Sequence, residues 1–376
     1  MPLEDRRRAL AQALDAQGWP ADSPWLREAV LQRVPRHHFA PDRLWEWDGH
    51  HHVPVDRTHA PGRWASLVYA GPDEPALTQI ADGLPSSSLS APSIVIDMLD
   101  SLMPEPGHHV LELGTGYGWN AALLAHRAGP GRVVSVETDP DLAAAARRRL
   151  TRYGLGATVL TGDGGLGAPG HEPFDRVIAT YAVEEVPWAW IAQCAPGARI
   201  VTPWGRLGHV ALTVADDSRS ATGWIQGLAT FMPRRGTDQG RDFHDLCTAI
   251  AATSTRTVPA AGVHALRDAS LIFSLRVTHP NIRIATTTTA TADGQVTAQA
   301  HDGQSSWATA TTRADGYACV EQGGPRPLMA EISQGQQHWQ DRGAPSLWDF
   351  GMTVASGRQY VWCKSPQEPW SSSGPV

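Results

Sequence analysis

The sequence is poor in the features that mark several protein classes. It has four cysteines in 376 residues, and no two of them form a CxxC pair. Zinc ribbons, thioredoxin-like sites and disulfide scaffolds are therefore not expected. No apolar run reaches the ~18 residues that a membrane span needs. No apolar stretch follows the N-terminal arginines, as it would in a signal peptide. We expect a reduced, cytoplasmic protein with no membrane partner.

Basic charge is also scarce, and Lys364 is the single lysine of the chain. The 31 Lys and Arg residues against 38 Asp and Glu residues give a formal net charge of −7. A general nucleic-acid binder is more often basic, so no nucleic-acid partner is expected. The triplet His50–His52 lies in a polar segment, which favours a solvated loop over a metal site. At 41% hydrophobic residues, the chain can bury a sizeable core, and its length suggests roughly two domains.

The pattern of predicted secondary structure changes twice along the chain. Residues 1–90 predict an N-terminal helical and substrate-side segment, with irregular structure over 49–90. Residues 91–235 begin with a helix at 92–103, after which short apolar runs alternate with helical segments. This alternation is typical of a parallel, doubly wound α/β sheet. Residues 241–376 carry apolar and Thr-rich runs such as Leu271–Val277, which predict a β-rich (α+β) accessory domain. The strands predicted for the α/β sheet are 109–113, 132–136, 157–161, 175–179 and 199–202.

A glycine-rich turn follows the first of these strands. The residues Gly114-Thr115-Gly116-Tyr117-Gly118 form a GxGxG turn between the strand and the next helix. A dinucleotide fingerprint would need glycine at 119, where this chain has Trp119, and no GK[ST] follows as in a P-loop. Glycine there lets the backbone approach a nucleotide closely. The turn alone is a moderate signal, because a purely structural turn has the same composition.

Two acids at the following strand ends strengthen the signal. Glu137 ends the next apolar run, 137 − 114 = 23 residues after Gly114, where an acid can bind a ribose diol. Asp163, between Gly162 and Gly164, could accept a hydrogen bond from an adenine amino group. Read singly, either acid also fits a helix cap or a loop. Read jointly, three strand ends meet at one crevice and predict an S-adenosylmethionine site.

Longer motifs resemble the protein-L-isoaspartate O-methyltransferase family over about residues 25–230. The resemblance implies a Rossmann-like class I methyltransferase sheet, S-adenosylmethionine as cofactor, and a peptide or protein substrate carrying Asp or isoAsp. It implies Ser90, with Ser88, as catalytic residues. Thr180 and Tyr181 follow the fourth strand, where a substrate would lie, and are substrate-side candidates, although structural roles fit them equally well. The motifs are Val34–Phe39, Ser88–Pro92, Val110–Gly118, Ser135–Glu137, Gly162–Gly164, Phe174–Thr180 and Ile200–Gly205. The implied cofactor residues are Glu112, Gly114, Thr115, Gly116, Tyr117, Gly118, Glu137, Gly162, Asp163 and Gly164.

The chain departs from the family pattern in two ways. The family motif usually begins with Thr where this chain has Ser88, at the end of the serine run Ser86–Ser88. The chain also continues for more than a hundred residues beyond the sheet. These departures resemble the branch that methylates an aspartate in a modified ribosomal peptide, yielding aspartimide or isoaspartate. Repair of isoaspartyl proteins and a catalytically silent peptide-binding module are the alternatives, and no oligomeric state is predicted.

Methyl transfer to a carboxylate requires few catalytic groups from the enzyme. A carboxylate acceptor has an unperturbed pKa of ~4 and is already anionic near neutral pH, so it needs no general base. Proximity and orientation can then contribute on the order of 7–11 kcal/mol. Ser90 and Ser88 could hold a carboxylate oxygen as neutral donors, although Ser90 could instead cap the following helix. Arg234 and Arg235 could orient an acidic peptide or form a solvated loop pair.

Overall fold

The computed structural model describes residues 2–205, 208–289 and 294–370. It divides into two compact units, which are described separately below. The first contains the chain up to residue 204 together with 208–235 and 354–357. The second contains 236–353 and the chain from 358 onward. No boundary separates residues 1–90 from 91–235, because apolar side chains from both segments enter one core.

The N-terminal part of the first unit is more regular than the sequence predicted. Residues 49–90, expected to be irregular, contain strands β2, β3 and β4 and a helix. With β1, which precedes them, these strands form an antiparallel sheet of order β2-β1-β3-β4. Pro54 and the serine run hide the usual alternation of apolar residues, and the β3–β4 pairing contains register shifts. The elements are α1 (Leu3–Gln17), α2 (Trp25–Glu28), η1 (Ala29–Arg33), η2 (Arg36–His38), β1 (Arg43–Trp47), β2 (His52–Asp56), α3 (Pro61–Val68), β3 (Ala76–Ala81) and β4 (Leu84–Leu89).

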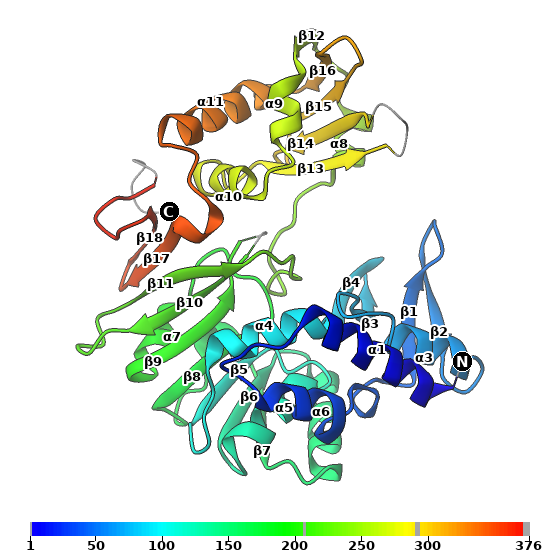
Figure 1. The fold of residues 1–376 in the computed structure, drawn as a ribbon, viewed down its shortest axis with the longest axis vertical. Coiled ribbons are helices and arrows are strands. Elements are labelled where there is room, and N and C mark those ends of the chain that lie inside the picture. Colours follow the sequence, from blue (N-terminus) through cyan, green and yellow to red (C-terminus); the bar gives the residue numbers. More distant parts are fainter. Residues whose placement is uncertain (1, 206–207, 290–293, 371–376) are drawn as a thin grey trace. The chain divides into compact units, whose positions relative to one another are not determined.

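The largest sheet confirms the doubly wound α/β prediction. In the first unit its strands follow the order β11-β10-β9-β8-β5-β6-β7 (Figure 1). Strands β5 to β9 pair in parallel, and β10 and β11 add antiparallel pairings. The order reverses at β5, which lies between β6 and β8, and open sheets bind ligands at such a point. The strands are β5 (Val110–Leu113), β6 (Val133–Glu137), β7 (Ala157–Thr161), β8 (Phe174–Ala179), β9 (Cys194–Pro203), β10 (His209–Val214) and β11 (Ser220–Gly227). The helices are α4 (Pro92–Leu102), α5 (Trp119–Ala128), α6 (Pro140–Arg152), η3 (Gly164–Leu166) and α7 (Trp188–Ala192).

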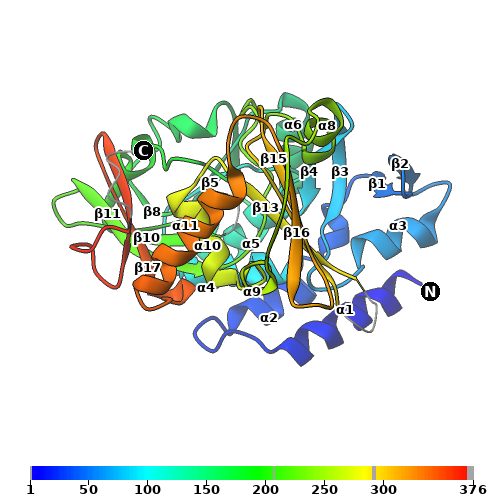
Figure 2. The same ribbon diagram turned by 90° about the horizontal axis from the view of Figure 1, so that it is seen from above.

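The second unit is an antiparallel sheet with helices. Its strands follow the order β12-β16-β15-β14-β13, and their apolar side chains share a core with α9, α10 and α11. Helices α10 and α11 lie side by side (Figure 2). The elements are α8 (Phe243–Ala249), β12 (Ser254–Pro259), α9 (Ala260–Ala265), α10 (Ala269–Thr278), β13 (Arg283–Thr288), β14 (Val296–His301), β15 (Trp307–Thr312), β16 (Tyr317–Gly323), α11 (Leu328–Asp341), η4 (Leu347–Asp349), β17 (Phe350–Ala355) and β18 (Arg358–Cys363).

One prediction in this unit is wrong. Leu271–Val277 was expected to be a strand but lies in α10. The carboxylate of Asp268 caps the helix by accepting hydrogen bonds from the backbone N–H groups of Ser270 (2.8 Å) and Leu271 (3.2 Å). The helix is buried on several sides, so its apolar residues show no helical period that the sequence could reveal.

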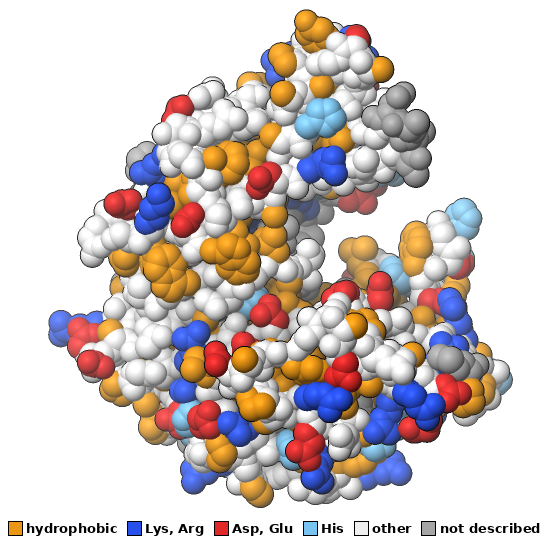
Figure 3. Space-filling model, in the orientation of Figure 1, with side chains coloured by type: hydrophobic (Ala, Val, Ile, Leu, Met, Phe, Trp, Pro, Cys, Tyr) orange, Lys and Arg blue, Asp and Glu red, His pale blue; other side chains and the backbone are white. Residues whose placement is uncertain are grey.

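Positive and negative side chains of the described residues are mixed on the surface and do not gather into patches of one sign. On the face drawn in Figure 3, Lys and Arg side chains are interspersed with Asp and Glu side chains. Ion pairs such as Arg27–Asp15 (2.8 Å) and Arg33–Glu28 (2.7 Å) neutralise arginine charge in place. None of the helices in the described ranges combines the length and apolar character needed to cross a membrane.

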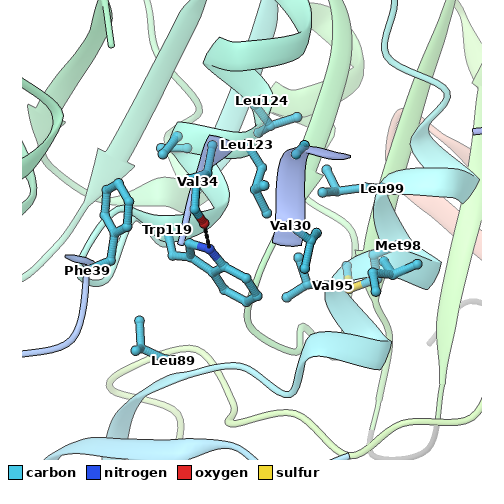
Figure 4. Packing of buried hydrophobic residues seen from close by; sticks show 14 of the residues in the cluster. Val30, Val34, Phe39, Leu89, Val95, Met98, Leu99, Trp119, Leu123 and Leu124 are labelled. Atoms are coloured by element: carbon cyan, nitrogen blue, oxygen red, sulfur yellow. Dashed lines mark hydrogen bonds between the residues drawn. The ribbon is translucent and has the colours of Figure 1, made fainter. Parts of the chain in front are cut away.

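Trp119, which breaks the dinucleotide fingerprint, is a core residue. Its side chain is buried, and its indole N–H donates a hydrogen bond to the carbonyl of Val34 at 3.0 Å. Figure 4 shows Val30, Val95 and Leu123 around it, drawn from the N-terminal segment, α4 and α5. The first residue of α5 therefore fastens the N-terminal segment to the sheet, and a bulky side chain serves there in place of glycine.

The guanidinium of Arg36 is buried beside this tryptophan. The side chain is only 2% exposed, and its Cζ lies 5.4 Å from the Trp119 ring centroid. Burial lowers the pKa of Arg36 to about 10, so the group stays charged at neutral pH. Its hydrogen bonds fix the loops before β3 and after β4. The carbonyl acceptors are those of Val68 (3.1 Å), Glu74 (3.4 Å), Leu89 (2.7 Å) and Ser90 (2.9 Å).

Replacing Arg36 should therefore destabilise the first unit strongly. Arg36→Met keeps much of the apolar length but removes the donors to all four carbonyl oxygens. We expect the free energy of unfolding to fall by roughly 3 kcal/mol or more, because buried acceptors lose their partners. Urea denaturation measures this change. Arg33→Met is the matched control, since Arg33 pairs with Glu28 on the surface and its removal should change almost nothing. If both variants lost the same amount of stability, the proposed role of the buried Arg36 hydrogen bonds would be contradicted.

Candidate functional site

A cavity of about 840 Å³ opens in the first unit where β5, β6 and β8 end. The glycine turn, the strand-end acids and the β4–α4 connection all contribute to its walls. Three predicted cofactor residues, Glu112, Gly118 and Gly162, do not line it. The predicted residues that do line it are Ser88, Ser90, Gly114, Thr115, Gly116, Tyr117, Glu137, Asp163, Gly164, Thr180 and Tyr181.

The glycine turn is held against the end of β8. Gly114 has φ +94°, a left-handed conformation that favours glycine. The Thr180 hydroxyl donates hydrogen bonds to the carbonyls of Gly114 (2.6 Å) and Leu113 (3.2 Å). A side chain at Gly114 would collide with Thr180 and Tyr181, and one at Gly164 would collide with the Tyr181 hydroxyl. Thr180 and Tyr181 thus support the floor of the cavity and also face its interior.

Glu137 presents a fixed carboxylate to the cavity. Its side chain is 6% exposed. The backbone N–H of Gly116 donates to Oε2 at 2.8 Å, and that of Asp139 donates to Oε1 at 3.0 Å. Each carboxylate oxygen has a second lone pair that can accept a further hydrogen bond. The carboxylate is therefore suited to hold a pair of neighbouring hydroxyls such as a ribose diol.

Glu112 lies behind the glycine turn and not in the cavity. It is fully buried, and it accepts hydrogen bonds from the Asn120 amide (2.8 Å) and from the hydroxyl of Ser135. The Ser135 hydroxyl in turn contacts that of Thr115, so the network reaches the turn. Burial raises the pKa of Glu112 to about 7, against the effect of the two hydrogen bonds. Glu112 is thus placed to position the turn from below.

Asp163 is held by a residue distant in sequence. The guanidinium of Arg234 donates to both carboxylate oxygens of Asp163, at 2.8 and 2.7 Å. The backbone N–H of Gly165 also donates to Asp163 at 2.8 Å. This N–H and Arg234 together lower the pKa of Asp163. The predicted adenine contact would therefore share its carboxylate with Arg234, which lies beside it in the cavity wall.

Arg235 joins two walls of the cavity. It donates to Asp139 at 2.9 Å, at the start of α6, and to Gln79 at 2.5 Å, on β3. The amide of Gln79 also donates to Asp139 at 3.1 Å. Arg234 and Arg235 are therefore both ion-paired, and both are exposed residues of a loop. One local signal pointed to Asp139, the helix-capping Asp-Pro step before α6. Nothing near Gln79 pointed to its role.

Serine side chains form the wall opposite the glycine turn. Side chains alternate along a strand, so Ser86 and Ser88 share one face of β4 and Ser87 lies on the other. The hydroxyl of Ser86 donates to Gln79 at 3.1 Å, and that of Ser87 accepts from Thr78 at 3.0 Å. Within the described chain, the hydroxyls of Ser88 and Ser90 form no hydrogen bond, and both residues line the cavity.

Ser90 does not cap α4. The N-cap position belongs to Ala91, and no side chain caps the helix. The carbonyl of Ser90 is fixed by Arg36 at 2.9 Å, so its hydroxyl is carried by an anchored backbone. The structure thus leaves this hydroxyl available to a ligand.

A further carboxylate, missed from the sequence, lies at the margin of the cavity. Asp97 on α4 lines the cavity, and its Oδ2 is 3.7 Å from Nε2 of the fully buried His209. Burial raises the pKa of Asp97 to about 6 and lowers that of His209 to about 4. Because both shifts favour the neutral forms, the two groups are not a strong ion pair near neutral pH.

The histidine triplet has an acidic neighbour that the sequence reading overlooked. His51 lies 3.5 Å from the carboxylate of Asp48, which also accepts the backbone N–H groups of His50 and His51. The described part of the chain contains no group of three or more His, Cys, Asp or Glu side chains that could hold a metal ion.

Comparisons with known proteins point to one family. The model of the protein-L-isoaspartate(D-aspartate) O-methyltransferase family matches residues 6–226. The protein-L-isoaspartate O-methyltransferase of Methanopyrus kandleri is 36% identical over 202 residues, which are 53% of this chain and 76% of that protein. Protein-L-isoaspartate O-methyltransferase 1 of Archaeoglobus fulgidus is 31% identical over 241 residues, 63% of this chain and 96% of that protein.

A solved structure named protein-L-isoaspartate O-methyltransferase shares the fold more widely. It covers 96% of this chain and 100% of its own, with a TM-score of 0.54 and 20% sequence identity. A likeness at that identity shows the fold alone. It confirms the class I methyltransferase architecture expected from the sequence.

Glu137 should dominate cofactor affinity among the strand-end acids. Glu137→Gln keeps the size and one acceptor oxygen but removes the negative charge. We expect S-adenosylmethionine to bind about ten- to a hundredfold more weakly, since a charge-assisted hydrogen bond contributes ~1.5–3 kcal/mol. Isothermal titration calorimetry measures the dissociation constant. Glu105→Gln, which changes an exposed carboxyl outside the cavity, should bind as wild type. Unchanged affinity of Glu137→Gln would refute the ribose assignment.

Glu112 should instead control how stability depends on pH. Its raised pKa means that, between about pH 4.5 and 7, the folded state keeps a proton that the unfolded state has released. The free energy of unfolding therefore falls as pH rises through this window and levels off above it. Glu112→Gln stays neutral and should remove a fall on the order of 3 kcal/mol. Urea denaturation across the window tests this, with Glu105→Gln as an exposed control. Parallel profiles of wild type and Glu112→Gln would contradict it.

Proposed function

Because this chain belongs to the protein-L-isoaspartate(D-aspartate) O-methyltransferase family, we propose that it methylates a normal aspartyl side chain in a modified ribosomal peptide. The coarser activity is that of the family: an S-adenosylmethionine-dependent protein carboxyl O-methyltransferase. The ester then collapses to a succinimide, which opens to isoaspartate or aspartate. The reaction is assigned to the cytoplasm, where the four unpaired cysteines would stay reduced.

The observation that carries this proposal is the pair of free hydroxyls on the serine wall. Ser88 and Ser90 line the cavity and bond to nothing else in the described chain. Two neutral donors can hold the oxygens of an anionic carboxylate without burying a second charge. Their position across from the glycine turn suits an acceptor that approaches a cofactor bound there.

The residues present fit S-adenosylmethionine. Glu137 would hold the ribose hydroxyls, Asp163 would accept from the adenine amino group, and Gly114 and Gly116 would admit the ligand close to the backbone. When bound, the cofactor supplies an electrophilic methyl group on a positively charged sulfur. The acceptor carboxylate, as an anion, would take this methyl group, with a C–O bond formed as the C–S bond breaks and both charges neutralised. The chain's own residues therefore orient and desolvate the acceptor, and none needs to move a proton.

The product of this step explains the later chemistry. A methyl ester is a better electrophile than a carboxylate, because methoxide leaves more easily than oxide. The backbone nitrogen of the next residue attacks the ester carbonyl, loses its proton, and releases methanol as the five-membered ring closes. Ring closure needs an unrestrained backbone, so we assign it to the released peptide.

Repair of isoaspartyl residues is the second candidate, favoured by the names of the relatives. The long second unit does not decide between the two. A solved structure that bears the isoaspartate name aligns over 96% of this chain. The serine run and Ser88, in place of the family's threonine, support the peptide-modifying branch. We assign recognition of the peptide to the second unit, since every residue proposed for cofactor binding lies in the first.

Matched peptides separate the candidates. Two synthetic peptides of one sequence, carrying Asp or isoAsp at a single position, are incubated with the full chain and S-adenosylmethionine and followed by mass spectrometry. The proposal expects a gain of one methylene on the Asp peptide, then a loss of methanol that continues after the enzyme is removed. Methylation confined to the isoAsp peptide would establish repair instead. Cofactor binding without turnover on either peptide, or on any modified peptide tried, would indicate a silent module.

Ser90 should be needed for turnover and not for cofactor binding. Ser90→Ala removes a donor to the acceptor carboxylate, and we expect kcat to fall about ten- to a hundredfold with an unchanged dissociation constant for S-adenosylmethionine. Ser66→Ala is the control, because the Ser66 hydroxyl lies outside the cavity and donates to the carbonyl of Arg63 at 2.6 Å. That variant should keep its rate per folded molecule. A normal rate in Ser90→Ala would remove Ser90 from the site.

A further inference from the structure

Strand β12 forms an uncovered edge of the second unit's sheet. It is the end strand in the order β12-β16-β15-β14-β13, and each of its residues is exposed or half-buried. The backbone N–H of Ala260, just after the strand, donates to the carbonyl of Gly316 at 3.0 Å, toward the β16 side. Alternation turns the nitrogen of Pro259 to the other side, where proline needs no partner. The N–H and C=O groups of Thr257 and Thr255 follow the same alternation and face the open edge.

An apolar groove runs beside this edge. Val258 and Arg256 stand in register with Ala318 and Val320 of β16, whose side chains lie under the helices. The helices do not extend over β12, and the groove left there has a volume of about 320 Å³. Its apolar lining includes Val258, Val263, Leu266, Val320, Met329 and Ile332.

Arg256 is the one charged residue among the described residues that line the groove. No carboxylate of the described chain pairs with it, and its side chain shares the groove face with Val258. The edge thus offers a row of backbone groups, an apolar groove and one unpaired cation. A peptide that matches this edge is extended and turns two side chains toward the groove. An acidic side chain would lie beside Arg256, and an apolar one two positions away would lie beside Val258.

We propose that the β12 edge binds an extended segment of the peptide substrate as an added strand, through an acidic-x-apolar pattern outside the methylated residue. This inference rests on the proposed function, which makes an Asp-containing peptide the substrate, and on the charge that such a peptide offers Arg256. Main-chain hydrogen bonds supply affinity in this mode, and the groove supplies selectivity. A segment bound there adds affinity without entering the methyl-transfer cavity.

Selection from random peptides displayed on phage, with the full chain as bait, tests the pattern. The enriched peptides are then titrated by fluorescence anisotropy, and hydrogen exchange of β12 is measured with and without them. We expect enrichment of acidic-x-apolar sequences and slower amide exchange at Thr255 and Thr257 on binding. Enrichment of other patterns, no enrichment, or unchanged exchange in β12 would overturn the proposal.

Two variants separate recognition from folding. Arg256→Glu should weaken binding at least about tenfold, and a peptide with lysine in place of its acid should restore it. Thr257→Pro removes the backbone N–H of residue 257, which faces the open edge and is not used in pairing with β16. It should therefore weaken peptide binding without changing the melting temperature. Arg267→Glu, an exposed charge reversal outside the groove, is the matched control. Wild-type affinity in both edge variants, or failure of the lysine peptide to restore binding, would refute the site.

The methyl-transfer assay keeps this inference distinct from the proposed function. If Asp peptides carrying the pattern are methylated with the same KM by wild type and Arg256→Glu, the edge proposal fails and the proposed function stands. If the pattern binds β12 but no Asp peptide is methylated, the edge proposal stands and the proposed function fails.

Discussion

The buried guanidinium of Arg36 is the constraint on which the first unit depends. The two terminal nitrogens of this planar group donate four hydrogen bonds, to carbonyls at the end of α3, before β3, at the end of β4 and just after it. Because breaking hydrogen bonds to a buried cation is costly, these segments cannot move independently without a large cost in free energy. The Ser90 backbone is one of the anchored points. The position of the proposed acceptor-binding hydroxyl is therefore set by a residue that touches neither substrate nor cofactor.

Around this anchor the cavity is built from two kinds of structure. The glycine turn, Glu137 and Asp163 come from strand ends of the sheet, where parallel topology brings them together. The serine wall comes from a small antiparallel sheet inserted before α4. Arg235 bonds to Gln79 of that small sheet and to Asp139, the N-cap of α6, which follows strand β6 of the large sheet. The cavity therefore lies where the two sheets meet, and its shape depends on the hydrogen-bonded residues that connect them.

Local patterns explain how far the sequence could predict this structure. The alternation of strands and helices and the glycine spacing are local patterns. The alternation correctly predicted the parallel sheet, and the glycine turn lines the cavity at its strand ends. The strand over Leu271–Val277 was wrong because a helix buried on several sides has no visible period. Arg235 and Gln79 are 156 residues apart, and no local pattern connects them. Glu112 illustrates a subtler limit, since its place in the motif could not show that its side chain points away from the cavity.

The length of these connections has a consequence for synthesis on the ribosome. The indole of Trp119 fastens a carbonyl made 85 residues earlier, and Arg235 reaches a serine carbonyl made 149 residues earlier. Until those partners emerge, the N-terminal helices expose the apolar side chains that later enter the shared core. During synthesis the core of the first unit therefore cannot be completed until both partners have been made, and its apolar side chains stay exposed until then.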